Sequence, residues 1–145
     1  MRFAITCVDR YIGVLDALLA AGWTPVKLFT VPLHSPLDSN RLVFEKARSL
    51  GIPAQVSRLE KDDLEDLARR GCQALIVASY DWRIGDWRPY LPHAVNFHPS
   101  PLPVGRGPYP AVRAILDGFE NWGVSCIAWS RASTAARCWR ARTSR

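Results

Sequence analysis

Short apolar runs alternate with longer stretches of helical periodicity along the chain. The runs at 2–8 and 74–79 are almost continuously apolar, which is typical of parallel strands buried on both faces. The predicted strands are 2–8, 26–31, 54–57, 74–79 and one that contains 96–98. The predicted helices are 13–21, 41–50 with Asn40 as its cap, 62 or 63 to 70, and 109–116. This alternation predicts an α/β fold with a Rossmann-like, mostly parallel sheet and helices on both faces.

Sheets of this kind bind ligands at the edge where the strands have their carboxyl ends. The first turn at that edge begins with Asp9 and Arg10, so both side chains are candidates for binding a substrate. The alternative is that they form a solvated pair on the surface. The strand at 74–79 leaves at the same edge through the segment 80–84, which is rich in aromatic residues.

The stretch NFHPSPLPVGRGPYP at 96–110 concentrates polar residues, prolines and glycines directly after an apolar run. Asn96 and His98 are two residues apart, so on a strand their side chains project from the same face. A neutral imidazole can accept or deliver a proton near pH 7, and a carboxamide can donate a hydrogen bond to an oxygen that gains charge. The pair suits acyl transfer, and the alternative is a strand end whose His caps a loop.

Composition limits the other classes of protein. The chain has 145 residues, 48% of them hydrophobic, which favours one folded domain over disorder. No apolar stretch approaches the roughly 20 residues of a membrane span, and Met1 leads directly into a strand pattern, so we expect a cytoplasmic protein. The four cysteines are widely spaced without a C-x-x-C pair, so they suggest neither a zinc site nor a disulfide framework.

The net charge of +6 is not evidence for a nucleic-acid partner, because it is concentrated at one end. Five of the 19 basic residues lie in 131–145, and no acidic residue follows Glu120. The remaining 14 basic residues are balanced by 13 acidic ones, a net charge of +1. The main body therefore offers no electrostatic attraction to a polyanion.

The segment from Asn96 resembles the folate-dependent formyltransferases, which include methionyl-tRNA, glycinamide-ribonucleotide and sugar-amine formyltransferases. Their signature is roughly N-x-H-x-S-x-L-P-x-x-[RK]-G, followed by a helix that ends in Gly and then by G-x-T. The matching residues here are Asn96, His98, Ser100, Leu102, Pro103, Arg106, Gly107, Gly118, Gly123 and Ser125, the last in place of Thr. The resemblance implies an enzyme that transfers a formyl group from 10-formyltetrahydrofolate to an acceptor amine, without a metal.

The resemblance also implies roles for particular residues. Asn96 would donate a hydrogen bond to the formyl oxygen, and His98 would assist proton transfer. Trp82, Arg83 and Ile84 match the loop that holds the pterin ring of the folate. The alternative for this loop is that its tryptophans only cover the sheet edge. The predicted substrate-binding residues are Asp9, Arg10, Ser100, Arg106 and Gly107.

The end of the chain departs from the family pattern. The third catalytic residue of the family is an Asp that orients the His, and its spacing places it near Thr134, where no carboxylate occurs. We therefore expect an incomplete catalytic domain at 1–130, an aberrant basic tail at 131–145, and impaired transfer. The alternative is an inactive remnant, or a protein that binds a partner or RNA through the tail.

The composition of the tail is typical of out-of-frame translation of GC-rich DNA. Back-translation of 131–140, started two bases later, recovers a D-x-G-x-[IV]-L motif where the family has its Asp, although the Asp and Gly depend on codon choice. The nature of the acceptor is a separate question. The loop at 32–40 contains no Lys or Arg, which favours a small amine over initiator tRNA. A nucleic acid is expected as a partner only if the acceptor is tRNA.

Overall fold

The structure is a computed structural model. It describes residues 1–32, 39–107 and 109–129 together with the backbone of 137–138. The chain divides into two compact units, Met1–Ala94 and Val95–Arg145, called here the N-terminal and the C-terminal unit. Each unit is described by itself.

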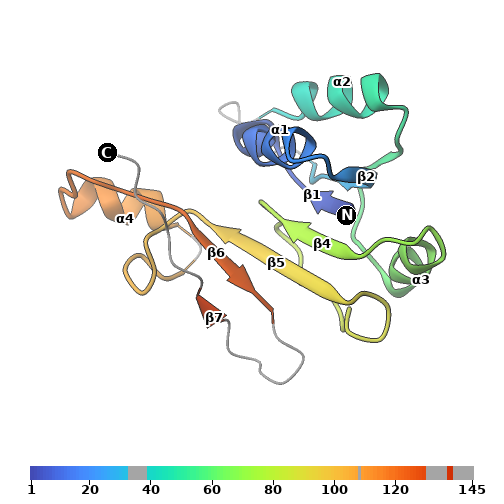
Figure 1. Cartoon of the computed structure of the whole chain (residues 1–145). Helices are drawn as coiled ribbons and strands as arrows, with labels where there is room; N and C mark the ends of the chain where they lie inside the picture. Colours follow the sequence, from blue (N-terminus) through green and yellow to red (C-terminus); the bar gives the residue numbers. More distant parts are fainter. Residues whose placement is uncertain (33–38, 108, 130–136, 139–145) are drawn as a thin grey trace. The chain divides into compact units, whose positions relative to one another are not determined.

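The described part of the N-terminal unit contains a parallel sheet with strand order β3-β2-β1-β4 (Figure 1). The strands are β1 (Arg2–Thr6), β2 (Thr24–Phe29), β3 (Ala54–Gln55) and β4 (Ala74–Val77). The helices are η1 (Asp9–Tyr11), α1 (Ile12–Ala20), α2 (Arg41–Leu50) and α3 (Lys61–Arg69). These elements confirm the predicted α/β fold.

The topology explains why the helices cover both faces of this sheet. Crossovers between parallel strands are right-handed. The chain moves outward from β1 through β2 to β3 and then returns past β1 to β4, so α3 lies on the face opposite to α1 and α2. Figure 1 shows α1 and α2 together and α3 apart from them. The core between these layers includes Phe3, Ile5, Leu15, Leu67, Leu75 and Ile76, each at most 2% exposed.

The helix ends follow local sequence signals. α3 begins with a capping box, in which the Glu60 side chain accepts from the Asp63 backbone and the Asp63 side chain accepts from the Glu60 N–H at 3.0 Å. Asp63 also pairs with Lys27 on β2, with 2.8 Å between Nζ and Oδ1. α2 ends at Gly51, whose φ of +64° is a conformation that glycine adopts without strain.

The prediction that Asn40 caps α2 is confirmed for its position, but its side chain has another role. Asn40 occupies the N-cap position of α2, but its side chain forms no capping bond, because Nδ2 donates to the Val31 carbonyl at 2.6 Å. The cap comes from other residues. Asp9 Oδ1 accepts from the Val43 N–H at 3.0 Å, and Ser39 Oγ accepts from the Arg41 N–H at 3.1 Å.

In the described part of the C-terminal unit the strands pair in antiparallel orientation. It contains most of β5 (His93–His98), then α4 (Pro110–Leu116), β6 (Ser125–Ala128) and β7 (Arg137–Cys138). β5 pairs with β6, and β6 with β7, in antiparallel register. The sequence pattern did not predict β6 or β7. The other residues of the predicted basic tail lie outside the described residues, and none of the helices that the structure describes is long and apolar enough to cross a membrane.

Candidate active site

The carboxyl ends of β1 and β4 lie side by side in the N-terminal unit. Thr6 pairs with Val77, and the Ala78 N–H donates to the Thr6 carbonyl at 3.0 Å. The strand order changes direction between β1 and β4, and this switch point is where α/β sheets bind ligands. The loops that follow the two strands carry the predicted substrate and folate residues. The sheet therefore brings these loops to one edge, as predicted.

Asp9 and Arg10 lie in η1, directly after β1. Asp9 connects η1 to α2, because its carboxylate accepts from the Val43 N–H and its own N–H donates to the Ser39 carbonyl at 2.9 Å. Arg10 is exposed, and its guanidinium carbon lies 5.6 Å from the centre of the Tyr11 ring. Asp9 thus has a structural role beside any contact with a substrate.

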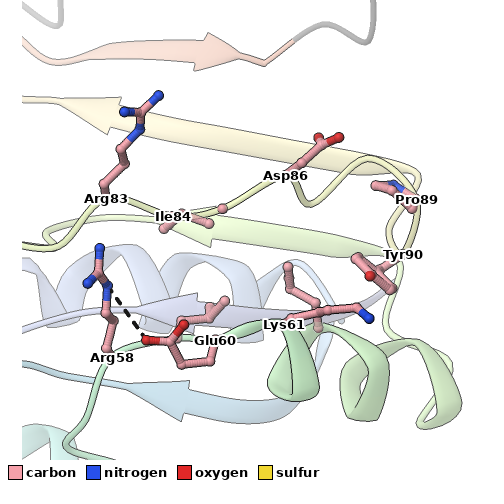
Figure 2. A pocket seen from close by; sticks show the side chains of 11 residues that line it. Arg58, Glu60, Lys61, Arg83, Ile84, Asp86, Pro89 and Tyr90 are labelled. Atoms are coloured by element: carbon pink, nitrogen blue, oxygen red, sulfur yellow. Dashed lines mark ion pairs between the residues drawn. The ribbon is translucent and has the colours of Figure 1, made fainter.

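A cavity of about 520 Å³ opens between the segment that leads into α3 and the segment that follows β4. Figure 2 shows Arg58, Glu60 and Lys61 on the first segment, and Arg83, Ile84 and Asp86 on the second. Its volume falls in the range of small-molecule sites, about 300–1,000 Å³. Two of the three predicted folate residues, Arg83 and Ile84, line this cavity. Trp82 does not line it, and its ring packs edge-on against Tyr80 with centroids 5.3 Å apart.

Some of the charged side chains around this cavity already have partners, and Arg83 does not among the described residues. Glu60 caps α3, and Asp86 Oδ1 lies 2.9 Å from Nη1 of Arg88. Arg83 is exposed and forms no ion pair with the described residues. An anionic group on a ligand would therefore meet Arg83 without displacing a partner.

Tyr80 holds the two walls of the cavity together. Its phenol oxygen accepts from the Leu59 N–H at 2.6 Å and donates to the Ser57 carbonyl at 3.4 Å. Burial raises the pKa of Tyr80 above its ordinary value of 10.0, so the phenol keeps the proton that this donation needs. Sequence reasoning missed the role of Tyr80 and the cavity wall formed by 58–64, because only the fold brings these distant segments together.

Asn96 and His98 lie on β5, where Asn96 pairs with Ile127 and His98 with Ser125 on β6. The strand geometry directs both side chains to one face, as the alternation predicted. Both residues are half-buried, and the Asn96 carboxamide has no hydrogen-bond partner among the described residues. His98 Nε2 lies 3.0 Å from the Gly105 carbonyl oxygen.

The loop at 99–107 is held by residues that follow α4. Ser125 Oγ donates to the Ser100 carbonyl at 2.7 Å and accepts from the Leu102 N–H at 2.9 Å. Trp122 Nε1 donates to the Pro99 carbonyl at 2.7 Å. Gly105 has a φ of +68° and lies against the Trp122 ring. Sequence reasoning missed Trp122, although its place beside the G-x-S motif was a signal.

The predicted substrate residues of this loop differ in their access to solvent. Ser100 is fully buried, and its Oγ has no partner among the described residues. Arg106 and Gly107 are exposed, and Gly107 has a φ of +103°. Within the described residues, no group of three or more His, Cys, Asp or Glu side chains could hold a metal ion.

Solved structures identify the class of fold. The chain matches glycinamide ribonucleotide transformylase 1 from Geobacillus kaustophilus with a TM-score of 0.72 at 21% identity, over 97% of this chain and 80% of that one. A sugar N-formyltransferase from Shewanella sp FDAARGOS_354 matches with a TM-score of 0.66 at 12% identity, over 97% of this chain and 55% of that one. The fold is therefore the Rossmann-like fold of the formyltransferases.

Curated sequences point in the same direction. The chain is 31% identical over 127 residues to the methionyl-tRNA formyltransferase of Halorhodospira halophila, covering 82% of this chain and 41% of that protein. It is 32% identical over 124 residues to that of Chloroflexus aggregans, covering 80% and 40%. No family model matches the chain. The chain belongs to the formyltransferase family. It spans about two fifths of the length of these methionyl-tRNA formyltransferases.

Proposed function

We propose that this chain transfers a formyl group from 10-formyltetrahydrofolate to an acceptor amine, with Asn96 and His98 as its catalytic residues. The observation that carries the proposal is the N-x-H pair on one face of β5 in a chain of the formyltransferase family. The carboxamide of Asn96, which has no partner among the described residues, is the group that donates to the formyl oxygen when the amine attacks the formyl carbon. His98 accepts the proton that the attacking nitrogen loses.

The rest of the reaction returns that proton to the donor. The tetrahedral intermediate collapses, the bond between the formyl carbon and the folate nitrogen breaks, and the proton goes to that nitrogen. The products are the formylated amine and tetrahydrofolate, so atoms and charge balance. Asn96 loses its partner oxyanion when the carbonyl reforms, and the site is ready for release of the product.

The cavity beside Arg83 and Ile84 is the proposed site of the folate, with Trp82 at its margin. Its volume of about 520 Å³ and its half-apolar walls suit an aromatic heterocycle. A folate also carries carboxylates, and Arg83 has no ion-pair partner among the described residues. These two properties support the assignment of a donor with a ring and an anionic tail.

The acceptor side is proposed to include Asp9, Arg10, Ser100, Arg106 and Gly107. The names of the curated relatives favour methionyl-tRNA, whereas the absence of Lys and Arg from 32–40 favours a small amine. Most of that loop, 33–38, lies outside the described residues. An assay with charged initiator tRNA and a panel of small amines distinguishes the two, and preferential formylation of the tRNA would reverse the preference for a small amine.

A second candidate function is binding without turnover. It is favoured by the absence of any carboxylate after Glu120, where the family has the Asp that orients its His. Loss of an orienting carboxylate can lower the rate by about four orders of magnitude. We therefore expect the purified chain to turn over about that much more slowly than a full-length relative, and a comparable rate would refute the impairment.

Three variants test the assignment of residues. His98→Ala is expected to abolish the residual turnover of 10-formyltetrahydrofolate, and Asn96→Ala to lower it about 100-fold or more. Arg83→Ala is expected to weaken folate binding, measured by calorimetry, about 10-fold. Arg48→Ala, on the exposed surface of α2, is the matched control. Equal folate affinity of the Arg83 and Arg48 variants would exclude the cavity as the donor site.

A further inference from the structure

His98 is oriented by a backbone carbonyl. Its Nε2 lies 3.0 Å from the Gly105 oxygen, and a carbonyl oxygen can only accept a hydrogen bond. The proton of the neutral ring must therefore be on Nε2. The other ring nitrogen, Nδ1, is then the only one that can accept a proton from a substrate.

The Gly105 carbonyl is in turn positioned by Trp122. A Cβ on Gly105 would lie 2.7 Å from Cη2 and 2.8 Å from Cζ2 of the indole, and 2.9 Å from Cβ of Ser100. Real Cβ atoms do not approach other atoms this closely. The indole therefore packs directly on the backbone of Gly105, at a φ of +68° that favours glycine.

The opposite end of the loop is held by the same side chain. Trp122 Nε1 donates to the carbonyl of Pro99, the residue that follows His98, at 2.7 Å. The ring also packs against Phe119, with centroids 5.4 Å apart. One indole thus contacts both ends of the loop that leaves His98 and returns to it.

We propose that Trp122 is a positioning residue for His98. By holding Pro99 and Gly105 together, it keeps the Gly105 carbonyl on Nε2–H and so presents Nδ1 to the acceptor amine. The role of Nδ1 in transfer rests on the proposed function, whereas the orientation of the ring does not. A neutral carbonyl aligns the imidazole as a carboxylate would, but it adds less stabilisation when the ring becomes charged. The chain therefore has an orienting group for His98 without the family's Asp.

The orientation can be measured without substrate. In protein labelled with ¹⁵N in its three histidines, His98 is assigned from the signal that His98→Gln removes. Free imidazoles already favour a proton on Nε2, so the decisive readout is exchange of the Nε2–H proton with water. We expect this proton to be visible and protected in the wild type. In Trp122→Phe, which lacks the indole N–H and the outer ring, we expect its exchange to accelerate 10-fold or more.

Trp87→Phe is the matched control, because Trp87 is a buried tryptophan of the N-terminal unit, 3% exposed. It should destabilise the chain and leave the His98 signal unchanged. If Trp122→Phe folds and its Nε2–H exchanges at the wild-type rate, the proposal is overturned. If circular dichroism shows that this variant does not fold, Phe119→Leu removes the ring contact at a half-exposed position. Unchanged exchange there would overturn the proposal in the same way.

Steady-state kinetics provide a separate test of the proposal. Where the wild type transfers formyl groups, Trp122→Phe is expected to lower kcat about 10-fold and to leave the KM for 10-formyltetrahydrofolate unchanged, because Trp122 does not line the folate cavity. A raised KM with unchanged kcat would contradict a role through His98. Absence of turnover in the wild type would refute the proposed function, while the exchange experiment would still decide the role of Trp122.

Discussion

One buried hydroxyl, that of Ser125, supports the loop between β5 and α4, and its removal should weaken the C-terminal unit by a defined amount. Ser125 is 1% exposed. Its Oγ donates to the Ser100 carbonyl at 2.7 Å and accepts from the Leu102 N–H at 2.9 Å. Ser125→Ala removes both hydrogen bonds and leaves the volume almost unchanged. The variant therefore isolates the two bonds from packing.

The magnitude follows from what the two partners retain. A hydrogen bond contributes about 0.5–1.5 kcal/mol net, so two contribute about 1–3 kcal/mol. The Leu102 N–H also donates to the Ser100 carbonyl at 3.0 Å, so neither group is left without a partner. The expected loss is therefore in the lower half of that range, about 1–2 kcal/mol. For a chain of this size it corresponds to a fall of roughly 2–8 °C in Tm.

Thermal and urea unfolding followed by circular dichroism measures the loss, and hydrogen exchange at the Leu102 amide locates it. Ser49→Ala is the control, because Ser49 is exposed on α2 and its Oγ donates to the Lys46 carbonyl at 2.8 Å. That change should stay within about 0.5 kcal/mol. The reasoning is refuted if Ser125→Ala is as stable as the control and the Leu102 amide exchanges as in the wild type.

Two further predictions concern the N-terminal unit. Asp63→Asn should cost about 1–3 kcal/mol, because Lys27, with a side chain 13% exposed, loses its counter-ion. Burial favours a raised pKa for Asp63, but hydrogen bonds from the Glu60 backbone, Lys27 and Gln55 outweigh it and lower the pKa below 3.8. The stabilisation is thus complete above about pH 3.8 and disappears as the pH falls through the folded pKa. Urea titrations of the wild type and Asp63→Asn should therefore converge in acid, and a difference in stability that persists there contradicts this prediction. Burial, with the nearby Asp9, raises the pKa of Cys7 to about 12. Maleimide should therefore label Cys7 at pH 7 only after unfolding, and a label mapped to Cys7 in the native chain would show that its site opens.

The N-terminal unit was largely predictable because its strands are buried on both faces. The runs at 2–8 and 74–79 became β1 (Arg2–Thr6) and β4 (Ala74–Val77), each two residues shorter than predicted. In both cases the apolar pattern continues past the last residue of the strand. Val8 and Ala78 are buried in the loops that follow, at 2% and 0% exposure, so apolar character there marks burial and not strand conformation.

The C-terminal unit was less predictable. β6 (Ser125–Ala128) alternates buried and half-buried residues, but it has only a few residues after a turn, which is too short for a period to be read. Only one wall of the cavity beside Arg83 was predicted from the sequence, for another reason. The segment after β4 carries a visible aromatic and basic pattern, whereas the opposite wall comes from 58–64, at least 19 residues earlier in the sequence. Only the pairing of strands brings these walls together.

The group that orients His98 could not be predicted from any pattern of side chains in the sequence. A carboxylate side chain is the group expected to align the histidine in this family, and the sequence has none after Glu120. The acceptor in the structure is the carbonyl of Gly105, a group that every residue type supplies. What the position does require is a side chain small enough for the Trp122 ring and a φ of +68°. A backbone acceptor therefore appears in sequence only indirectly, as the glycine that makes room and the tryptophan that fills it, and a missing Asp does not by itself show that the histidine is unoriented.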